Sequence, residues 1–177
     1  MCTLYATNNN IESIEFLGEE NNSLQFLRLL KLSNNNITSL PHLNPPFIDT
    51  VHLNNNKINT CANFKGHNEI KFLEMRKNEL ESCNGLHKMP KLESLYLAEN
   101  KITSISDLKE LDSLKTLHLR KNELKDLTNV PNLPSLEYLN LRETQIEKVE
   151  EIKNLEILTN VTDLNLLGTP LEEDLGD

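Results

Sequence analysis

Residues 92–111, LESLYLAENKITSISDLKEL, decide the fold of this chain. The stretch opens with a short alternating piece, Leu95-Tyr96-Leu97, and reaches Asn100 three residues later. The apolar residues that follow are spaced by three and stand at Ile102, Ile105, Leu108 and Leu111. Neither a helical period of 3.6 nor a strand period of 2 fits the whole stretch. The pattern therefore predicts one coil of a solenoid: a short strand, a tight turn and a return arm of 3₁₀ or helical turns.

The same strand-and-turn pattern recurs along the whole chain, mostly in steps of 22 residues. The eight turn positions are Asn9, Asn35, Asn56, Asn78, Asn100, Asn122, Thr144 and Thr169. This pattern resembles the L-x-x-L-x-L-x-x-N-x-L signature of leucine-rich repeats. We expect an α/β solenoid, a horseshoe of about eight 22-residue repeats with a parallel sheet on its concave face and 3₁₀ or helical return arms. The repeats fill residues 1–177, so we expect a single domain.

The turn residues have a structural role. Where a strand ends inside a coil, backbone groups lose their sheet partners and cannot reach water, and an asparagine amide supplies both a donor and an acceptor. The eight turn residues are therefore expected to form a ladder that holds successive coils together. Thr144 and Thr169 offer only a hydroxyl, so the last two coils should be less regular than the middle four.

The return arms differ in length and composition. The insertion at 147–156 is long enough for a true helical turn or two, whereas Pro41, Pro45 and Pro46 predict an extended arm in the second repeat. The arm length resembles the SDS22-like subclass of leucine-rich repeats. That resemblance implies an intracellular protein that works by binding other proteins.

A second resemblance lies between Lys71 and Glu173. The runs KFLEMRKNELES, LESLYLAENKI, LKTLHLRKNEL, LEYLNLRET and LNLLGTPLEED are similar to the leucine-rich repeat protein of ciliary radial spokes. The resemblance implies a structural component of the axoneme, near the third radial spoke, that binds spoke proteins. That family's opening cap and final stretch have no counterpart here, so we expect a fragment of a longer protein that lacks one or both caps.

Charge is concentrated at one end of the chain. Residues 1–142 carry 16 basic and 17 acidic side chains, and residues 143–177 carry 2 and 10. The acidic end argues against nucleic acid as a partner, because phosphates would be repelled. It favours a basic partner, or serves only solubility. No apolar run is long enough to span a membrane, and no secretory signal is visible at the N-terminus.

No catalytic, metal or cofactor constellation is present in the sequence. Cys83 and His87 are spaced as possible ligands, but no second pair completes a tetrahedral site. The five glycines form no phosphate-binding loop, so we expect no cofactor and no small-molecule substrate. Cys61 and Cys83 should pack as small reduced side chains, although a bridge between neighbouring coils is geometrically conceivable.

The concave face carries the candidate binding residues. Residues that alternate with the strand leucines point away from the core, and they include all three tyrosines and three of the four arginines. Aromatic residues and arginine dominate protein-binding hot spots, although exposed strand positions favour aromatics in any case. The predicted patch comprises Phe72, Arg76, Tyr96, His118, Arg120, Tyr138 and Arg142. Its predicted rim comprises Glu74, Lys77, Glu99, Lys121 and Glu143.

The sequence therefore predicts a non-catalytic, protein-binding scaffold within a large assembly. The radial-spoke resemblance implies a cytoplasmic subunit of the ciliary axoneme. The alternative is an SDS22-like regulatory subunit that binds a protein phosphatase or another cytosolic or nuclear partner. An enzyme or a nucleic-acid binder is disfavoured by the missing constellations and by the acidic end.

Overall fold

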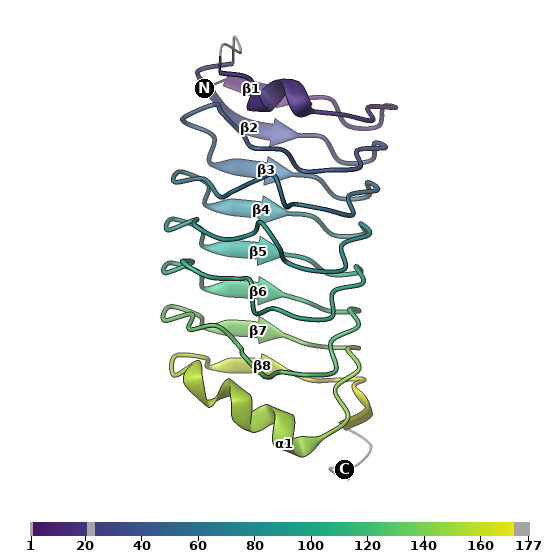
Figure 1. Cartoon of the computed structure of the whole chain (residues 1–177), viewed down its shortest axis with the longest axis vertical. Helices are drawn as coiled ribbons and strands as arrows, with labels where there is room; N and C mark the ends of the chain where they lie inside the picture. Colours follow the sequence, from purple (N-terminus) through teal and green to yellow (C-terminus); the bar gives the residue numbers. More distant parts are fainter. Residues whose placement is uncertain (1, 21–23, 172–177) are drawn as a thin grey trace.

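The computed structural model describes residues 2–20 and 24–171, and it forms a solenoid with one parallel sheet (Figure 1). The eight strands pair in sequence order, as the repeat pattern predicted. They span Cys2–Tyr5 (β1), Leu27–Lys31 (β2), Thr50–His52 (β3), Phe72–Glu74 (β4), Ser94–Tyr96 (β5), Thr116–His118 (β6), Tyr138–Asn140 (β7) and Asp163–Asn165 (β8). The leucine-rich-repeat fold class is confirmed.

The return arms contain less helix than the sequence predicted. A 3₁₀ turn lies at Glu15–Gly18 (η1), and the predicted helical insertion forms Val149–Ile152 (α1) and Lys153–Ile157 (η2). Between β2 and β7 the arms are turns and extended segments, so the expected 3₁₀ or helical arms are wrong there. The reason is that a typical arm turn closes one isolated bond, such as Phe64 N–H to Cys61 O at 2.9 Å, and one such bond does not propagate into a helix. No helix of the described residues is long and apolar enough to cross a membrane.

The core is one continuous column of leucine and isoleucine between the sheet and the arms. The middle residue of each strand from β3 to β7 is fully buried, and so are the apolar arm residues that face it. Cys61 and Cys83 are buried in this column as free thiols, as predicted. Burial raises the pKa of both thiols, which keeps them protonated and unreactive.

The asparagine ladder is the main polar feature of the interior. Asn100 Nδ2 donates to Leu97 O of its own coil at 2.9 Å and to Met75 O of the preceding coil at 3.0 Å. Its Oδ1 accepts the Leu80 N–H at 3.1 Å. One amide therefore joins two coils, through one bond within its own coil and two to the preceding coil. The same arrangement is found at Asn35, Asn56, Asn78 and Asn122.

The two ends of the ladder differ from its middle. Asn9 is exposed and its side-chain amide donates only locally, to Thr7 O at 2.9 Å, so its predicted place in a buried ladder is wrong. Thr144 and Thr169 are buried, and each hydroxyl donates to a carbonyl of its own coil at 2.7 and 2.9 Å. The register of β7 with β8 is nevertheless unbroken. The last coils thus keep the strand register but differ in the hydrogen bonding of their turns and in the helical arm between β7 and β8.

Each turn bends through a left-handed residue directly before the ladder position. The φ angle there lies between 52° and 60° in seven coils and is 70° at Gly168. Such angles are unusual for residues other than glycine and asparagine. In the first three coils the position is asparagine, and Asn34 Nδ2 donates to Asn8 Oδ1 at 2.8 Å while Asn55 Nδ2 donates to Asn34 Oδ1 at 2.7 Å. The first coils thus carry a second amide ladder on their surface.

The ladder makes a stability prediction. Asn100→Ala removes the partner of the buried Leu80 N–H and of two carbonyls, so it should lower the free energy of unfolding by about 3 kcal/mol. Asn9→Ala, the matched change at the exposed end, should lower it by less than about 0.5 kcal/mol. Urea unfolding of both variants measures the difference. Equal effects would contradict the assignment of the ladder as an interior brace.

Candidate functional site

Three columns of side chains lie on the face that points away from the core, called here the sheet face. The central column reads Tyr5, Lys31, His52, Glu74, Tyr96, His118, Asn140 and Asn165. The column before it reads Leu29, Thr50, Phe72, Ser94, Thr116, Tyr138 and Asp163. The last column, two residues after the central one, includes Asn54, Arg76, Ala98, Arg120 and Arg142. Because the register is unbroken from β2 to β8, neighbours in a column are neighbours in space.

Five aromatic side chains form a continuous row across β3–β7, called here the ring row. Its members are His52, Phe72, Tyr96, His118 and Tyr138. Successive ring centroids lie 5.1, 5.3, 4.8 and 5.1 Å apart, within the range of favourable aromatic pairs. Each ring is partly exposed, so the row presents aromatic surface to solvent while its members hold one another in place.

Two charged residues brace the middle of the ring row. The Arg76 guanidinium lies over the Tyr96 ring, 4.5 Å from its centroid, in a cation–π contact. Glu74 joins this arginine to the end of the row, because its Oε1 lies 3.1 Å from Arg76 Nε and its Oε2 lies 2.8 Å from His52 Nδ1. Burial lowers the pKa of His118, and the positive charge of Arg76 lowers it further. His118 is therefore neutral at neutral pH.

A second group, called here the cation cluster, lies at the ends of β6 and β7. Glu143 Oε1 accepts from Arg120 Nε at 3.0 Å and lies 2.8 Å from Arg120 Nη2 and 3.0 Å from Arg142 Nε. Glu143 Oε2 lies 3.5 Å from Lys121 Nζ. Desolvation acts to raise the pKa of Glu143, but the hydrogen bond from Arg120 and the three positive charges outweigh it and lower the pKa. One carboxylate is thus shared by three cations.

The structure places all seven predicted patch residues on the sheet face, but in two groups rather than one. Phe72, Tyr96, His118 and Tyr138 belong to the ring row, Arg76 packs on it, and the other two arginines belong to the cation cluster. Sequence reasoning missed that His52 extends the row, and it assigned Glu74 and Glu143 only to a rim. His52 could have been found, since it stands in the central column beside Phe72. The sharing of a carboxylate by several cations has no sequence signal.

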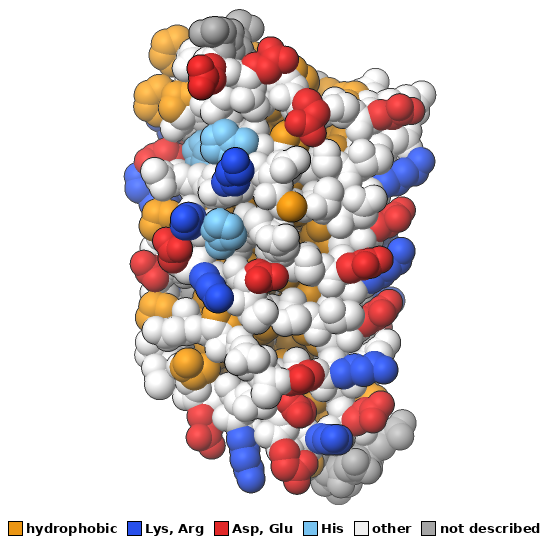
Figure 2. Space-filling model, viewed as in Figure 1, with side chains coloured by type: hydrophobic (Ala, Val, Ile, Leu, Met, Phe, Trp, Pro, Cys, Tyr) orange, Lys and Arg blue, Asp and Glu red, His pale blue; other side chains and the backbone are white. Residues whose placement is uncertain are grey.

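Outside the sheet face, charges of opposite sign alternate from coil to coil. Figure 2 shows one such face, with acidic and basic side chains following one another along the edge where the strands end. Three exposed pairs join neighbouring coils, namely Lys91–Glu69 at 2.7 Å, Lys115–Glu93 at 3.8 Å and Lys101–Glu79 at 4.0 Å. Exposed pairs of this kind contribute little to stability, and they leave no large excess of one charge.

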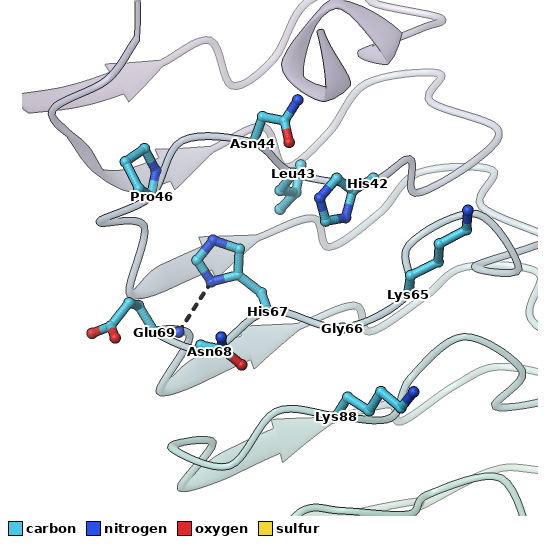
Figure 3. Close-up of a pocket in the computed structure, with 10 residues that line it drawn as sticks. All are labelled: His42, Leu43, Asn44, Pro46, Lys65, Gly66, His67, Asn68, Glu69 and Lys88. Atoms are coloured by element: carbon cyan, nitrogen blue, oxygen red, sulfur yellow. Dashed lines mark hydrogen bonds between the residues drawn. The ribbon is translucent and has the colours of Figure 1, made fainter. Parts of the chain in front are cut away.

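An open pocket of about 470 Å³ lies among the return arms of the second, third and fourth coils (Figure 3). Its walls carry two imidazoles, from His42 and His67, and two lysines, Lys65 and Lys88. In Figure 3 the lysine side chains extend away from His67 rather than converging on it. Among the described residues no group of three or more histidine, cysteine or acidic side chains could hold a metal ion.

The imidazoles of this pocket join the arms to one another. His67 Nδ1 accepts the Glu69 N–H at 3.1 Å and its Nε2 donates to Pro45 O at 3.2 Å, which requires the neutral ring protonated on Nε2. His42 Nδ1 donates to Phe64 O of the next coil at 2.9 Å. Both rings therefore have structural roles, and we assign the sheet face rather than this pocket as the candidate site.

Comparison with known proteins agrees with this architecture. The family described as leucine-rich repeats, in two copies, matches residues 68–110 and 112–154. These matches identify leucine-rich repeats within residues 68–154, in agreement with the solenoid fold. No curated protein matches its sequence at a significant level. A leucine-rich repeat solenoid is typically a non-catalytic scaffold that binds other proteins.

Two solved structures with a similar fold are internalins of Listeria monocytogenes. The internalin InlF superposes with a TM-score of 0.58 at 21% identity, covering 92% of this chain and 53% of its own. Internalin C2 superposes with a TM-score of 0.56 at 23% identity, covering 95% of this chain and 72% of its own. This chain therefore spans about half the length of InlF. At these identities the likeness shows the fold alone.

The bonding of His67 makes a pH prediction. Burial lowers the pKa of His67 below its ordinary value, and the nearby His42 lowers it further. The hydrogen bond to Pro45 O and the negative charge of Glu69 raise the pKa, but they do not outweigh the lowering. The folded state therefore binds this proton less readily than the unfolded state, so stability should fall as the pH drops from about 6.5 toward the folded-state pKa.

His67→Gln should reduce this loss of stability, because the substituted side chain no longer titrates. The measurement is the urea midpoint at about pH 7.5 and about pH 5.5 in the native chain and the variant. Asn44→Ala is the control, since it removes a 2.6 Å bond to Gly18 O in the same pocket wall without removing a titrating group. It should lower both midpoints equally. An unchanged pH dependence in His67→Gln would refute the assignment.

Proposed function

We propose that this protein is a non-catalytic scaffold that binds another protein through its sheet face. The observation that carries the proposal is the ring row, braced by Arg76 stacked on Tyr96. Aromatic and arginine side chains supply most of the energy at protein interfaces when a partner buries them. No other described part of this chain presents as many neighbouring aromatic rings.

The geometry of the ring row favours binding because it is ordered in advance. Each ring contacts the next, and the short strands beneath are held by a continuous core and by the ladder. A partner would therefore order few side chains on docking, which reduces the entropic cost of association. Within a column, side chains on neighbouring strands are roughly 4.8 Å apart. This spacing suits a helix or an extended segment that lies across the strands.

The charge distribution supports a protein partner over a nucleic acid. The chain has a formal net charge of -9, and the coil after β7 carries most of the excess. A phosphate backbone that followed the sheet face to β8 would approach the Asp163 carboxylate of that strand. A folded protein or a peptide segment can end before it reaches this carboxylate.

We further propose that the scaffold works within a large cytoplasmic assembly, the ciliary axoneme. The support is the similarity of runs such as TLHLR and YLNLR to the radial-spoke repeat protein. The alternative, supported by arm length, is a regulatory subunit of a protein phosphatase. A tagged chain expressed in ciliated cells separates the two: accumulation along the axoneme supports the first, and residence in nucleus and cytosol with a co-purified phosphatase supports the second.

Binding through the sheet face makes a prediction for variants. Tyr96→Ala or Arg120→Ala should weaken affinity for a partner co-purified with the tagged chain by roughly 1–3 kcal/mol, because each removes a hot-spot side chain. The fold should persist, since both side chains are partly exposed. Titration calorimetry measures the affinity, and circular dichroism checks the fold. Lys109→Ala, at an exposed position on a return arm, is the control and should have little effect. The site assignment would be refuted if the sheet-face variants kept the native affinity and the arm variant lost it.

A further inference from the structure

The cation cluster holds more positive charge than its single carboxylate can neutralise. Arg120, Lys121 and Arg142 all lie within 3.5 Å of Glu143. Three positive charges against one leave an excess of two. We propose that this cluster is the docking site for a carboxylate of an acidic peptide segment, and that Glu143 occupies it as an internal stand-in when no partner is bound.

The hydrogen-bond geometry supports exchange of one carboxylate for another. Glu143 Oε1 alone receives the contacts from Arg120 Nε, Arg120 Nη2 and Arg142 Nε, at 3.0, 2.8 and 3.0 Å. A guanidinium has five N–H donors, so both arginines keep donors for a second acid. The arginine side chains are 38% and 46% exposed. A partner carboxylate can therefore reach them from solvent.

Glu143 is placed so that its side chain can leave the cluster while its backbone stays. Its N–H donates to Leu167 O at 2.9 Å, which holds the turn in place. Its left-handed φ of 55° puts its side chain over the equivalent position of the next coil, Gly168. A Cβ at Gly168 would lie 3.2 Å from Glu143 Cγ. The absence of a side chain at Gly168 therefore leaves space for the Glu143 side chain to move.

The surroundings extend the positive charge along the sheet. From β4 to β7, the last column of the sheet face and the turn residues beside it hold five cations and two carboxylates. These are Arg76, Lys77, Arg120, Lys121, Arg142, Glu99 and Glu143. Counting Glu74 of the central column, the excess is still +2 on a chain of net charge -9. An acidic segment is attracted here by charge complementarity, and little of the remaining surface would attract it.

The cluster adjoins the ring row, so this inference rests on the proposed function and specifies its partner. Arg120 follows His118 by two residues, and Arg142 lies in the same coil as Tyr138. A segment with a carboxylate at the cluster would therefore lay a neighbouring apolar side chain on the rings. Single-stranded RNA could use stacking and phosphates in the same way. The peptide is favoured because a carboxylate already fits the cluster.

The test uses fluorescence anisotropy with three labelled probes. The first is a pentapeptide with tryptophan flanked on each side by two glutamates, the second is its glutamine counterpart, and the third is a uridine decamer. The native chain should bind the glutamate peptide about tenfold more tightly than the glutamine peptide, because charge-assisted bonds are lost in the latter. Tighter binding of the decamer than of the glutamate peptide would overturn the proposal.

Opposite effects of two variants distinguish docking from a purely structural role. Glu143→Gln removes the internal competitor and should tighten binding of the glutamate peptide about fivefold, whereas Arg120→Gln should weaken it about tenfold. Glu93→Gln is the control, since it removes the same charge from an exposed pair at the other end of the strands. It should change affinity less than about twofold. An equal gain in Glu93→Gln, or no gain in Glu143→Gln, would overturn the proposal.

Folding and the proposed function are checked separately. Thermal unfolding shows whether each variant is folded, and Arg120→Lys, which keeps the charge but loses the fork of donors, should bind with intermediate affinity. Arg120→Lys binding as tightly as the native chain would overturn the role of the fork. The inference fails and the proposed function stands if substitutions in the cation cluster leave the affinity for the glutamate peptide unchanged while Tyr96→Ala still lowers the affinity for the co-purified partner.

Discussion

The structure depends on how the interior turns satisfy their backbone. At the end of each strand the chain bends inside the solenoid, where its N–H and carbonyl groups have no water and no sheet partner. The asparagine amide supplies both missing partners and reaches into the preceding coil, as Asn100 does with Met75 O and the Leu80 N–H. An aliphatic residue at this place would leave those groups unpaired. The ladder therefore joins coil to coil in one register, and the continuous leucine core packs around that register.

A fixed register turns the sheet face into a regular lattice of side chains. Residues 22 apart in sequence become neighbours, so rings from five coils meet as the ring row and charges from adjacent coils meet as ion pairs. The exposed side chains hold one another, because Glu74 contacts both His52 and Arg76, and Arg76 covers Tyr96. This order in the absence of a partner is what suits the surface to binding, since few side chains must be fixed on association.

Charge separates the binding face from the rest of the molecule. Exposed ion pairs elsewhere join one acidic and one basic side chain of neighbouring coils, whereas the ends of β6 and β7 gather three cations around Glu143. The acidic residues of the last coils lie beyond this cluster in the sequence. Along the sheet face, the ring row extends from β3 to β7 and the cation cluster lies at the ends of β6 and β7.

The sequence by itself determined the repeat, the sheet order, the ladder and the sheet-face columns. These follow from a period of about 22 residues, and a period is local information that survives without coordinates. The tertiary structure alone decided how the side chains on those columns pair. His52 joins the ring row, Glu143 is shared among three cations, and Asn9 stands exposed because no coil precedes it within the described residues. Such pairings depend on side-chain torsion angles and on contacts between coils, and a one-dimensional pattern of residue types contains neither.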